Sequence, residues 1–188
     1  GYGAVVWLPT YFVRVHGLTT IEVGQILALI IGIGGGIGTA LGGNIADRLG
    51  KRDVRWNFWL IALLGLFGLP FSVASYLSVD TTAAILLMIL PVCVGAVYFG
   101  PTLAMLHTLV KPEMRSLSSA ILLFINNIIG LGLGPLMIGV MSDYLSTDYG
   151  ARALPYAMAA STLLSIWAAV HLWLASRTLP ADIEKVRQ

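Results

Sequence analysis

Long, nearly uncharged apolar stretches restrict what this chain can fold into more than any other feature. Five of them are long enough to cross a hydrocarbon layer about 30 Å thick, which takes roughly 20 helical residues. These stretches are residues 21–46, 56–77, 83–110, 117–141 and 154–173. A sixth, residues 1–13, is too short by about a third and resembles a span that lacks its beginning. We therefore expect an all-α integral membrane protein with six transmembrane helices.

Composition agrees with a lipid environment. Hydrophobic residues make up 57% of the 188 residues and charged residues 11%, whereas a soluble domain carries about 25% charged residues. Membrane lipid is thus the expected surrounding, and a net charge of +2 does not favour a nucleic-acid partner. The single cysteine, Cys93, lies inside an apolar run, so the chain has no internal disulfide and Cys93 is interpreted as packing.

Basic residues are distributed unevenly between alternate connections. Nine fall in the second connection, the fourth connection and the tail, and two, Arg14 and Arg152, fall in the others. The positive-inside rule places the nine in the cytoplasm. We therefore predict a multi-pass protein of the cell (inner) membrane, with residues 1–176 as the transmembrane region and residues 177–188 as a cytoplasmic tail. Because the chain starts inside apolar sequence without a methionine, we expect further sequence before it.

A weak internal repeat with an offset of 96 residues links the second and fifth stretches. The first copy reads GIGGGIGTALGGNIADRL from Gly32, and the second reads IIGLGLGPLMIGVMSDYL from Ile128. Asp47 and Asp143 occupy the same place in the two copies but fall at opposite membrane faces. This pattern predicts two inverted three-helix repeats, as in transporter halves. The alternative is chance, because glycines are common in membrane helices, and static close packing would also explain them.

Asp47 lies near the C-terminal end of its predicted helix, where the helix dipole disfavours a negative charge. Arg48, Lys51 and Arg52 could compensate it locally, and the N-terminus of a neighbouring helix could do so as well. The plain alternative is a solvated charge in a loop.

The segment G-N-I-A-D-R-L-G-K-R, residues 43–52, resembles the cytoplasmic signature G-x-x-x-D-R-x-G-R-R of the major facilitator superfamily. In that family the loop follows the second helix of each half and stabilises the outward-open state by docking on the opposite half. The resemblance implies a gating role for this signature loop (residues 43–52). Its members are Gly43, Asp47, Arg48, Gly50, Lys51 and Arg52. Lysine at 51, where arginine is usual, keeps the charge but loses the planar fork.

Residues 127–135, together with Gly100-Pro101-Thr102 and residues 112–115, resemble the spinster-like branch of the same superfamily. The resemblance implies that the chain is the C-terminal half of a twelve-helix secondary transporter. Such a protein moves a small organic or amphipathic solute, lysolipid-like in this branch, by alternating access with ion coupling. The implied partners are the missing N-terminal half and a small-molecule substrate.

Six polar or aromatic residues within the predicted spans are candidates for the substrate cavity. In a superfamily half the first, second, fourth and fifth helices line the cavity, and these residues lie on the first, fourth and fifth. They are Trp7, Tyr11, Tyr98, Thr102, Asn126 and Asn127. The alternative is packing between helices by the aromatics and hydrogen bonding between helices by the asparagines.

The sequence does not favour an enzyme. No His, Cys and Asp cluster has metal-ligand spacing, and His107 and Asp143 are predicted at opposite faces, so we expect neither cofactor nor metal. No carboxylate lies near the middle of a span, so titrating groups of a proton relay would belong to the missing half. The alternative function is a self-contained six-helix channel or transporter that works as a dimer.

Overall fold

The computed structural model describes residues 2–187, and within this range every regular element is a helix. The elements are α1 Tyr2–His16, α2 Thr20–Leu27, η1 Ala28–Gly34, α3 Gly35–Gly50, α4 Trp56–Leu77, α5 Thr81–Ala96, α6 Phe99–Thr108, η2 Pro112–Met114, α7 Arg115–Ile125, η3 Asn126–Leu133, α8 Gly134–Tyr149, η4 Gly150–Arg152, α9 Ala153–Thr162 and α10 Leu164–Arg187. η1 and η3 are π-helical segments inside longer helices, and η2 and η4 are short 3₁₀ turns. The predicted all-α class is confirmed.

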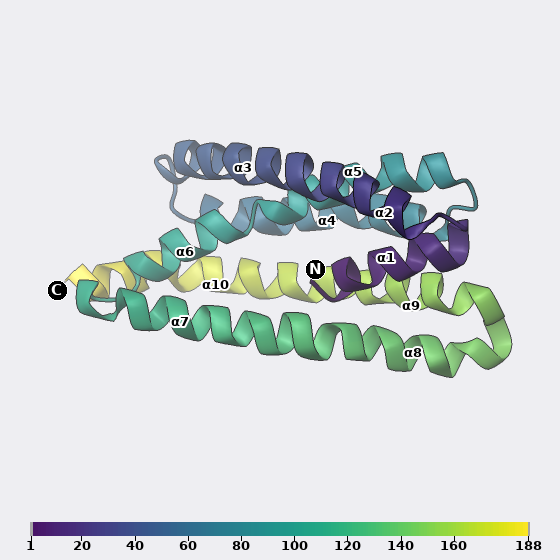
Figure 1. Cartoon of the computed structure of the whole chain (residues 1–188). Helices are drawn as coiled ribbons and strands as arrows, with labels where there is room; N and C mark the ends of the chain where they lie inside the picture. The colour runs from purple at the N-terminus through teal and green to yellow at the C-terminus, as the bar shows by residue number, and fades with distance from the viewer. Residues whose placement is uncertain (1, 188) are drawn as a thin grey trace.

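These elements join into long rods that lie side by side and alternate in direction (Figure 1). In the described part of the chain, four continuous helical runs are long and apolar enough to cross a membrane: Thr20–Gly50, Trp56–Leu77, Thr81–Thr108 and Pro112–Val186. The last run turns back at η4, where Gly150 has φ +52° (Figure 1). α1 has 15 residues and is shorter than a full span. The predicted stretch 56–77 coincides with α4.

Local side-chain chemistry sets the turns between the rods. Gly17 adopts φ +68° directly after α1, a conformation that favours glycine. Thr19 and Glu22 form a capping box at the start of α2. Asp80 caps α5 by accepting a hydrogen bond from the backbone N–H of Ala83 at 2.6 Å. These caps end one rod and begin the next within a few residues.

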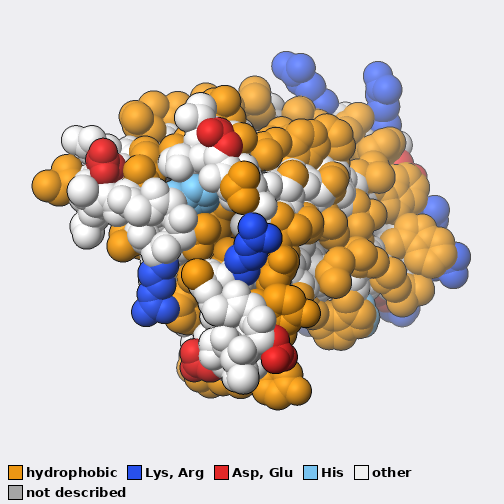
Figure 2. Space-filling view, turned by 90° about the vertical axis from the view of Figure 1, so that its right-hand side faces the viewer, with side chains coloured by type: hydrophobic (Ala, Val, Ile, Leu, Met, Phe, Trp, Pro, Cys, Tyr) orange, Lys and Arg blue, Asp and Glu red, His pale blue; other side chains and the backbone are white. Residues whose placement is uncertain are grey.

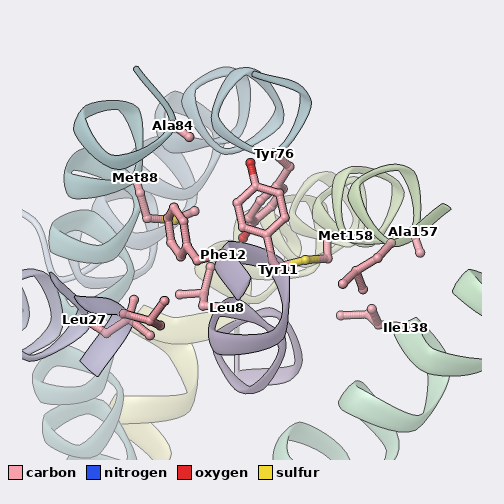
Figure 3. Close-up of a cluster of buried hydrophobic side chains, with 12 residues drawn as sticks. Leu8, Tyr11, Phe12, Leu27, Tyr76, Ala84, Met88, Ile138, Ala157 and Met158 are labelled. Carbon is pink, nitrogen blue, oxygen red and sulfur yellow. The ribbon is translucent and has the colours of Figure 1, made fainter. Parts of the chain in front are cut away.

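The core lies where α1 crosses the middle of the bundle (Figure 3). Leu8, Tyr11 and Phe12 of α1 pack among Met88 of α5 and Met158 of α9, and all five are at most 1% exposed. Many large apolar side chains point outward instead, and Phe124 and Trp167 are 65% and 66% exposed. A soluble protein does not carry so much outward apolar surface, whereas lipid solvates it.

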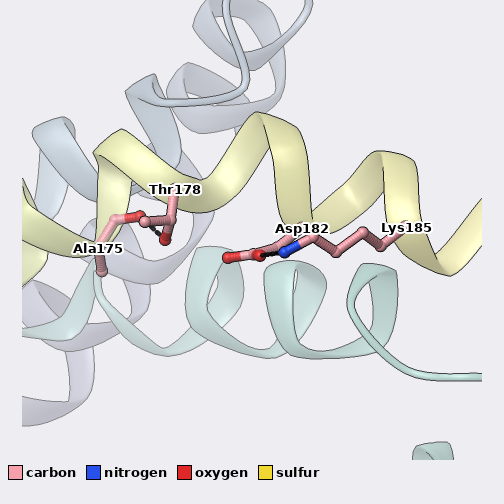
Figure 4. A network of polar contacts seen from close by, with 4 residues as sticks. All are labelled: Ala175, Thr178, Asp182 and Lys185. Atoms are coloured by element: carbon pink, nitrogen blue, oxygen red, sulfur yellow. Dashed lines mark hydrogen bonds and ion pairs between the residues drawn. The ribbon is translucent and has the colours of Figure 1, made fainter.

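α10 continues as a helix through the predicted tail to Arg187. Leu179 and Ile183, one helical turn apart, are buried. On the exposed side, Lys185 pairs with Asp182 at 3.1 Å (Figure 4). The tail therefore forms a helical extension that packs on the bundle, and its cytoplasmic location stays a prediction.

Candidate functional site

The bundle has two chemically different ends (Figure 1). The α3–α4 turn, the α6–α7 turn and the end of α10 lie at one end, and the other three turns lie at the opposite end. The nine basic residues predicted for the cytoplasm belong to the first group of segments, and Arg14 and Arg152 to the second. The structure thus brings the predicted basic residues to one end, which we call the basic end.

The signature loop is mostly helical. α3 continues to Gly50, so Gly43, Asp47 and Arg48 lie on its last two turns. Only the following turn is irregular, and it is held by hydrogen bonds. The N–H of Arg52 donates to the Leu49 carbonyl at 2.9 Å, and the N–H of Arg55 donates to Oδ1 of Asp53 at 2.9 Å. Helix and turn hydrogen bonds therefore run through most of this segment, which we call the platform.

The two glycines of the signature loop face different surroundings. A Cβ at Gly50 would lie 2.8 Å from Nδ2 of Asn57, a buried side chain that donates to the Val54 carbonyl at 2.9 Å. Gly50 is thus required by contact between α3 and the start of α4. A Cβ at Gly43 meets nothing within 4 Å. No contact within the chain explains Gly43, and its surface is open to another body.

The charged residues of the signature loop project outward. Asp47, Arg48, Lys51 and Arg52 are all exposed. Among the described residues, only Lys185 and Asp182 approach within ion-pair distance, so the expected local ion pair of Asp47 with Arg48, Lys51 or Arg52 is not formed. Arg55, by contrast, buries its Nε atom without a hydrogen-bond partner. The platform therefore presents an uncompensated carboxylate and three cations.

Tryptophans gather next to this platform, where aromatic side chains of membrane proteins commonly form an interfacial belt. The rings of Trp56 and Trp59 meet edge to face at 5.6 Å. Trp59 donates from Nε1 to Oγ of Ser176 at 2.8 Å, which ties α4 to α10. The guanidinium of Arg177 stacks 3.8 Å from the ring centre of Trp173. Sequence reasoning missed the Trp59–Ser176 bond, because its partners are 117 residues apart.

Two of the repeated glycines, Gly38 and Gly134, lie at close helix contacts. A Cβ at Gly38 would clash with the carbonyl oxygen of Cys93, so α3 touches the backbone of α5 there. A Cβ at Gly134 would lie 3.1 Å from Cα of Gly3, and a Cβ at Gly3 would lie 2.8 Å from the carbonyl carbon of Gly134, so α8 touches the backbone of α1. Glycine at these positions permits backbones to approach.

Trp7 and Tyr11 bond to other rods of the same bundle. Trp7 donates from Nε1 to the Pro135 carbonyl at 2.8 Å and so connects α1 to α8. Tyr11 is 0% exposed and donates its hydroxyl proton to the Ser75 carbonyl at 2.8 Å. Tyr11 therefore lies in the packed core and does not reach an open face, whereas Trp7 is only partly buried.

His16, just beyond the predicted first span, completes the network around Tyr11. Its Nε2 lies 2.9 Å from the Tyr11 hydroxyl and its Nδ1 lies 3.1 Å from Oγ1 of Thr81. Because the one Tyr11 proton goes to Ser75, Nε2 of His16 carries a proton and Nδ1 accepts from Thr81. Burial lowers the pKa of His16, and nearby Asp80 opposes this only in part. The imidazole is thus a neutral link, and no sequence motif pointed to it.

The other cavity candidates are half-buried or exposed. Tyr98 and Thr102 are half-buried one turn apart, and the Thr102 hydroxyl donates to the Tyr98 carbonyl at 2.6 Å. Asn126 is half-buried, and exposed Asn127 donates to the Leu123 carbonyl at 2.8 Å. The Asn127 bond stays within its own helix. Both asparagines begin the π-helical segment η3, a type of irregularity that often marks functional sites.

The residues described by the structure contain no group of three His, Cys, Asp or Glu side chains that could hold a metal ion. The model of the family described as Major Facilitator Superfamily matches residues 1–135. A curated MFS-type efflux pump of Mycolicibacterium smegmatis is 35% identical over 97% of this chain and 43% of its own length. The chain belongs to the major facilitator superfamily. Family membership indicates a transporter and not an enzyme.

Other superfamily members share the sequence or the fold. The human glucose-6-phosphate exchanger SLC37A1 is 30% identical over 75% of this chain and 27% of its own length. Two structures of a bacterial homologue of the human lysosomal transporter Spinster, both inward-facing, one unoccupied and one occupied, match 97% of this chain with TM-scores of 0.86 and 0.79. At 24% identity these two show a shared fold. The chain covers less than half of each of these relatives.

Proposed function

We propose that this chain is the C-terminal six-helix half of a secondary active transporter that moves a small organic or amphipathic solute by alternating access. The observation that carries the proposal is the pair of glycine contacts described above. The two contacts occur at equivalent places in the two halves of the bundle, which is the arrangement expected of an inverted repeat. The superfamily membership and the coverage of less than half of the relatives support the same reading.

The inverted repeat rests on equivalent contacts at equivalent positions. We number the predicted spans as passes in chain order. Gly38 of the second pass (α3) touches the fourth pass (α5) at Cys93, and Gly134 of the fifth pass (α8) touches the first pass (α1) at Gly3. Gly38 and Gly134 are 96 residues apart, which is the offset of the repeat. If the first three passes are exchanged with the last three, the contact between the second and fourth passes becomes the contact between the fifth and first passes. The π-helical segments η1 and η3 also fall at overlapping places in the two copies.

A second six-helix unit would cover the fifth pass, which is the least buried of the bundle. None of the residues of α7 or η3 is buried. On α8 a shallow apolar groove of about 560 Å³ is lined by Leu133, Leu136, Met137, Val140, Met141 and Tyr144. We infer that this face and the open side of α3 meet the missing half. A dimer of this chain is the alternative occupant.

The platform at the basic end supports the gating role implied for the signature loop. Asp47 is exposed and has no ion-pair partner among the described residues. Gly43 leaves open space one helical turn before it. A cationic side chain or a helix N-terminus of the other half could reach Asp47 there. We propose that this contact holds one conformational state, with Arg48, Lys51 and Arg52 making complementary contacts.

For the cavity wall we propose Trp7, Tyr98, Thr102, Asn126 and Asn127, and we omit Tyr11 because it is fully buried. The relatives transport different cargo by name, an exported compound in one case and glucose 6-phosphate in another. We propose a lysolipid-like amphiphile as the first substrate class to test. We further propose that ion coupling uses groups of the other half, because the middle of the passes lacks carboxylates.

Labelling of introduced cysteines tests the proposed membrane orientation. With the basic end in the cytoplasm, cysteines at Arg52 and Lys185 should react with an impermeant maleimide only after the membrane is opened. A cysteine at Thr147, in the opposite turn, should react in intact cells. The matched background is the Cys93→Ser variant, which removes the native thiol. The reverse labelling pattern would contradict the orientation.

A further inference from the structure

A pocket of about 340 Å³ opens at the end of the bundle opposite the basic end. Three turns surround it: the end of α1, the end of α4 with its following loop, and η4 with the start of α9. Its volume is at the lower limit of small-ligand pockets, about 300 Å³. Figure 2 views this end of the molecule and shows basic side chains between two lobes that carry acidic ones.

Arg14 and Arg152 both line this pocket. They are the two basic residues that the chain places at this end. They come from segments far apart in sequence, and no local motif requires them to meet. Among the described residues neither is within ion-pair distance of a carboxylate. Two like charges around one pocket repel each other, and a bound anion would convert that repulsion into attraction.

Among the described residues, no acidic group lines this pocket or lies within ion-pair distance of either arginine. Asp80 accepts the N–H of Ala83, and Glu22 accepts from Thr19, so both serve as helix caps. Asp143 and Asp148 lie exposed on α8 and do not line the pocket. The nearby His16 hydrogen-bonds to Tyr11 and does not line the pocket. The pocket itself is therefore cationic.

Apart from Ser78, the rest of the lining is apolar and aromatic. Val15, Leu77, Val79 and Pro155 contribute aliphatic surface, and Tyr156 contributes a ring that also packs edge to face on Tyr149 at 5.0 Å. Val79 is 82% exposed at the rim. Such a lining suits an anionic head group that is joined to apolar atoms.

We propose that this pocket binds a phosphate-bearing head group between the guanidinium groups of Arg14 and Arg152. Each guanidinium presents a planar fork of donors. A phosphate monoester presents three terminal oxygens and can accept bidentate bonds from two forks at once, whereas a carboxylate has two oxygens and offers a single bidentate face. The head group comes either from an organophosphate in the water or from an anionic lipid. Binding here is separate from transport and can be measured without it.

The test uses the intact transporter that contains this chain, with binding measured for two kinds of probe. sn-Glycerol 3-phosphate represents the aqueous source, and nanodiscs containing phosphatidic acid, compared with phosphatidylcholine alone, represent the lipid source. Arg14→Gln and Arg152→Gln should each weaken binding about tenfold or more, as expected for loss of a charge-assisted bond. Arg→Lys at either position should fall between, because lysine lacks the fork. Lys111→Gln, an exposed basic residue at the other end, is the matched control.

Chemical protection provides a readout that needs no substitution. Bound phosphate probe should protect Arg14 and Arg152 from phenylglyoxal, mapped by peptide mass spectrometry, and should leave Arg48 reactive. Arginine-dependent binding of glycerol phosphate would assign the aqueous source, and dependence confined to phosphatidic acid would assign the lipid. Equal affinity in wild type and both glutamine variants, or no protection of either arginine by any probe, would overturn the proposal.

Discussion

Replacing Gly38 by alanine should lower the stability of the bundle by roughly 1–3 kcal/mol or more, as overpacking does. The added methyl would clash with the backbone oxygen of Cys93, and backbone cannot move aside as the end of a flexible side chain can. α3 and α5 would have to separate along their contact. The measurement is the midpoint of thermal unfolding of the intact protein in detergent.

Gly36→Ala is the matched control on the same helix. A Cβ at Gly36 meets nothing within 4 Å, and alanine favours a helix interior over glycine by about 1 kcal/mol. This variant should therefore keep or raise the unfolding midpoint. Equal midpoints for the two variants would show that the close contact between α3 and α5 does not exist in the membrane protein.

Changing Asp47 to asparagine should reduce transport by the intact protein about tenfold or more, while leaving insertion and the unfolding midpoint unchanged. The substitution keeps the shape of the side chain and removes its charge. A charge-assisted bond between the halves stabilises one state by about 1.5–3 kcal/mol, which is a factor of roughly 10–100 in a conformational equilibrium. The measurement is the initial rate of uptake in proteoliposomes, together with the unfolding midpoint.

Asp148→Asn serves as the control for the loss of one negative charge, because Asp148 is exposed in the last turn of α8 at the opposite end. Its transport rate should equal that of the wild type. Unchanged turnover of Asp47→Asn would remove the gating role from the signature loop and leave Asp47 a solvated charge.

Much of the fold could be predicted from the sequence, because an apolar stretch long enough to cross a membrane predicts a helix of about the same length. Residues 56–77 correspond to α4 without a shift, and the stretch 21–46 lies within the run Thr20–Gly50. The predicted ends of the helices agree less well with the structure. α3 reaches Gly50 and α10 continues past Trp173, since polar residues at the membrane boundary can continue a helix in water.

Contacts between rods could not be predicted, because helical periodicity indicates which face of a helix is apolar but not which other helix packs against that face. The sequence makes Tyr11 a candidate for the substrate cavity, yet it lies in the core against Ser75. The Trp7 bond to Pro135 spans 128 residues. Of the repeated glycines, Gly38 and Gly134 lie close to another helix, whereas Gly36 does not. The repeat could not show that the contacts would be made with α5 and α1.

The most direct test of the account is transport by the two halves of the intact protein, expressed separately and together. This chain alone should insert into the membrane and show no uptake or export. Co-expression with the remaining half should restore transport, because the cavity and the contact of Asp47 both need the second six-helix unit. Measurable transport by this chain alone would contradict the account and favour a self-contained six-helix dimer.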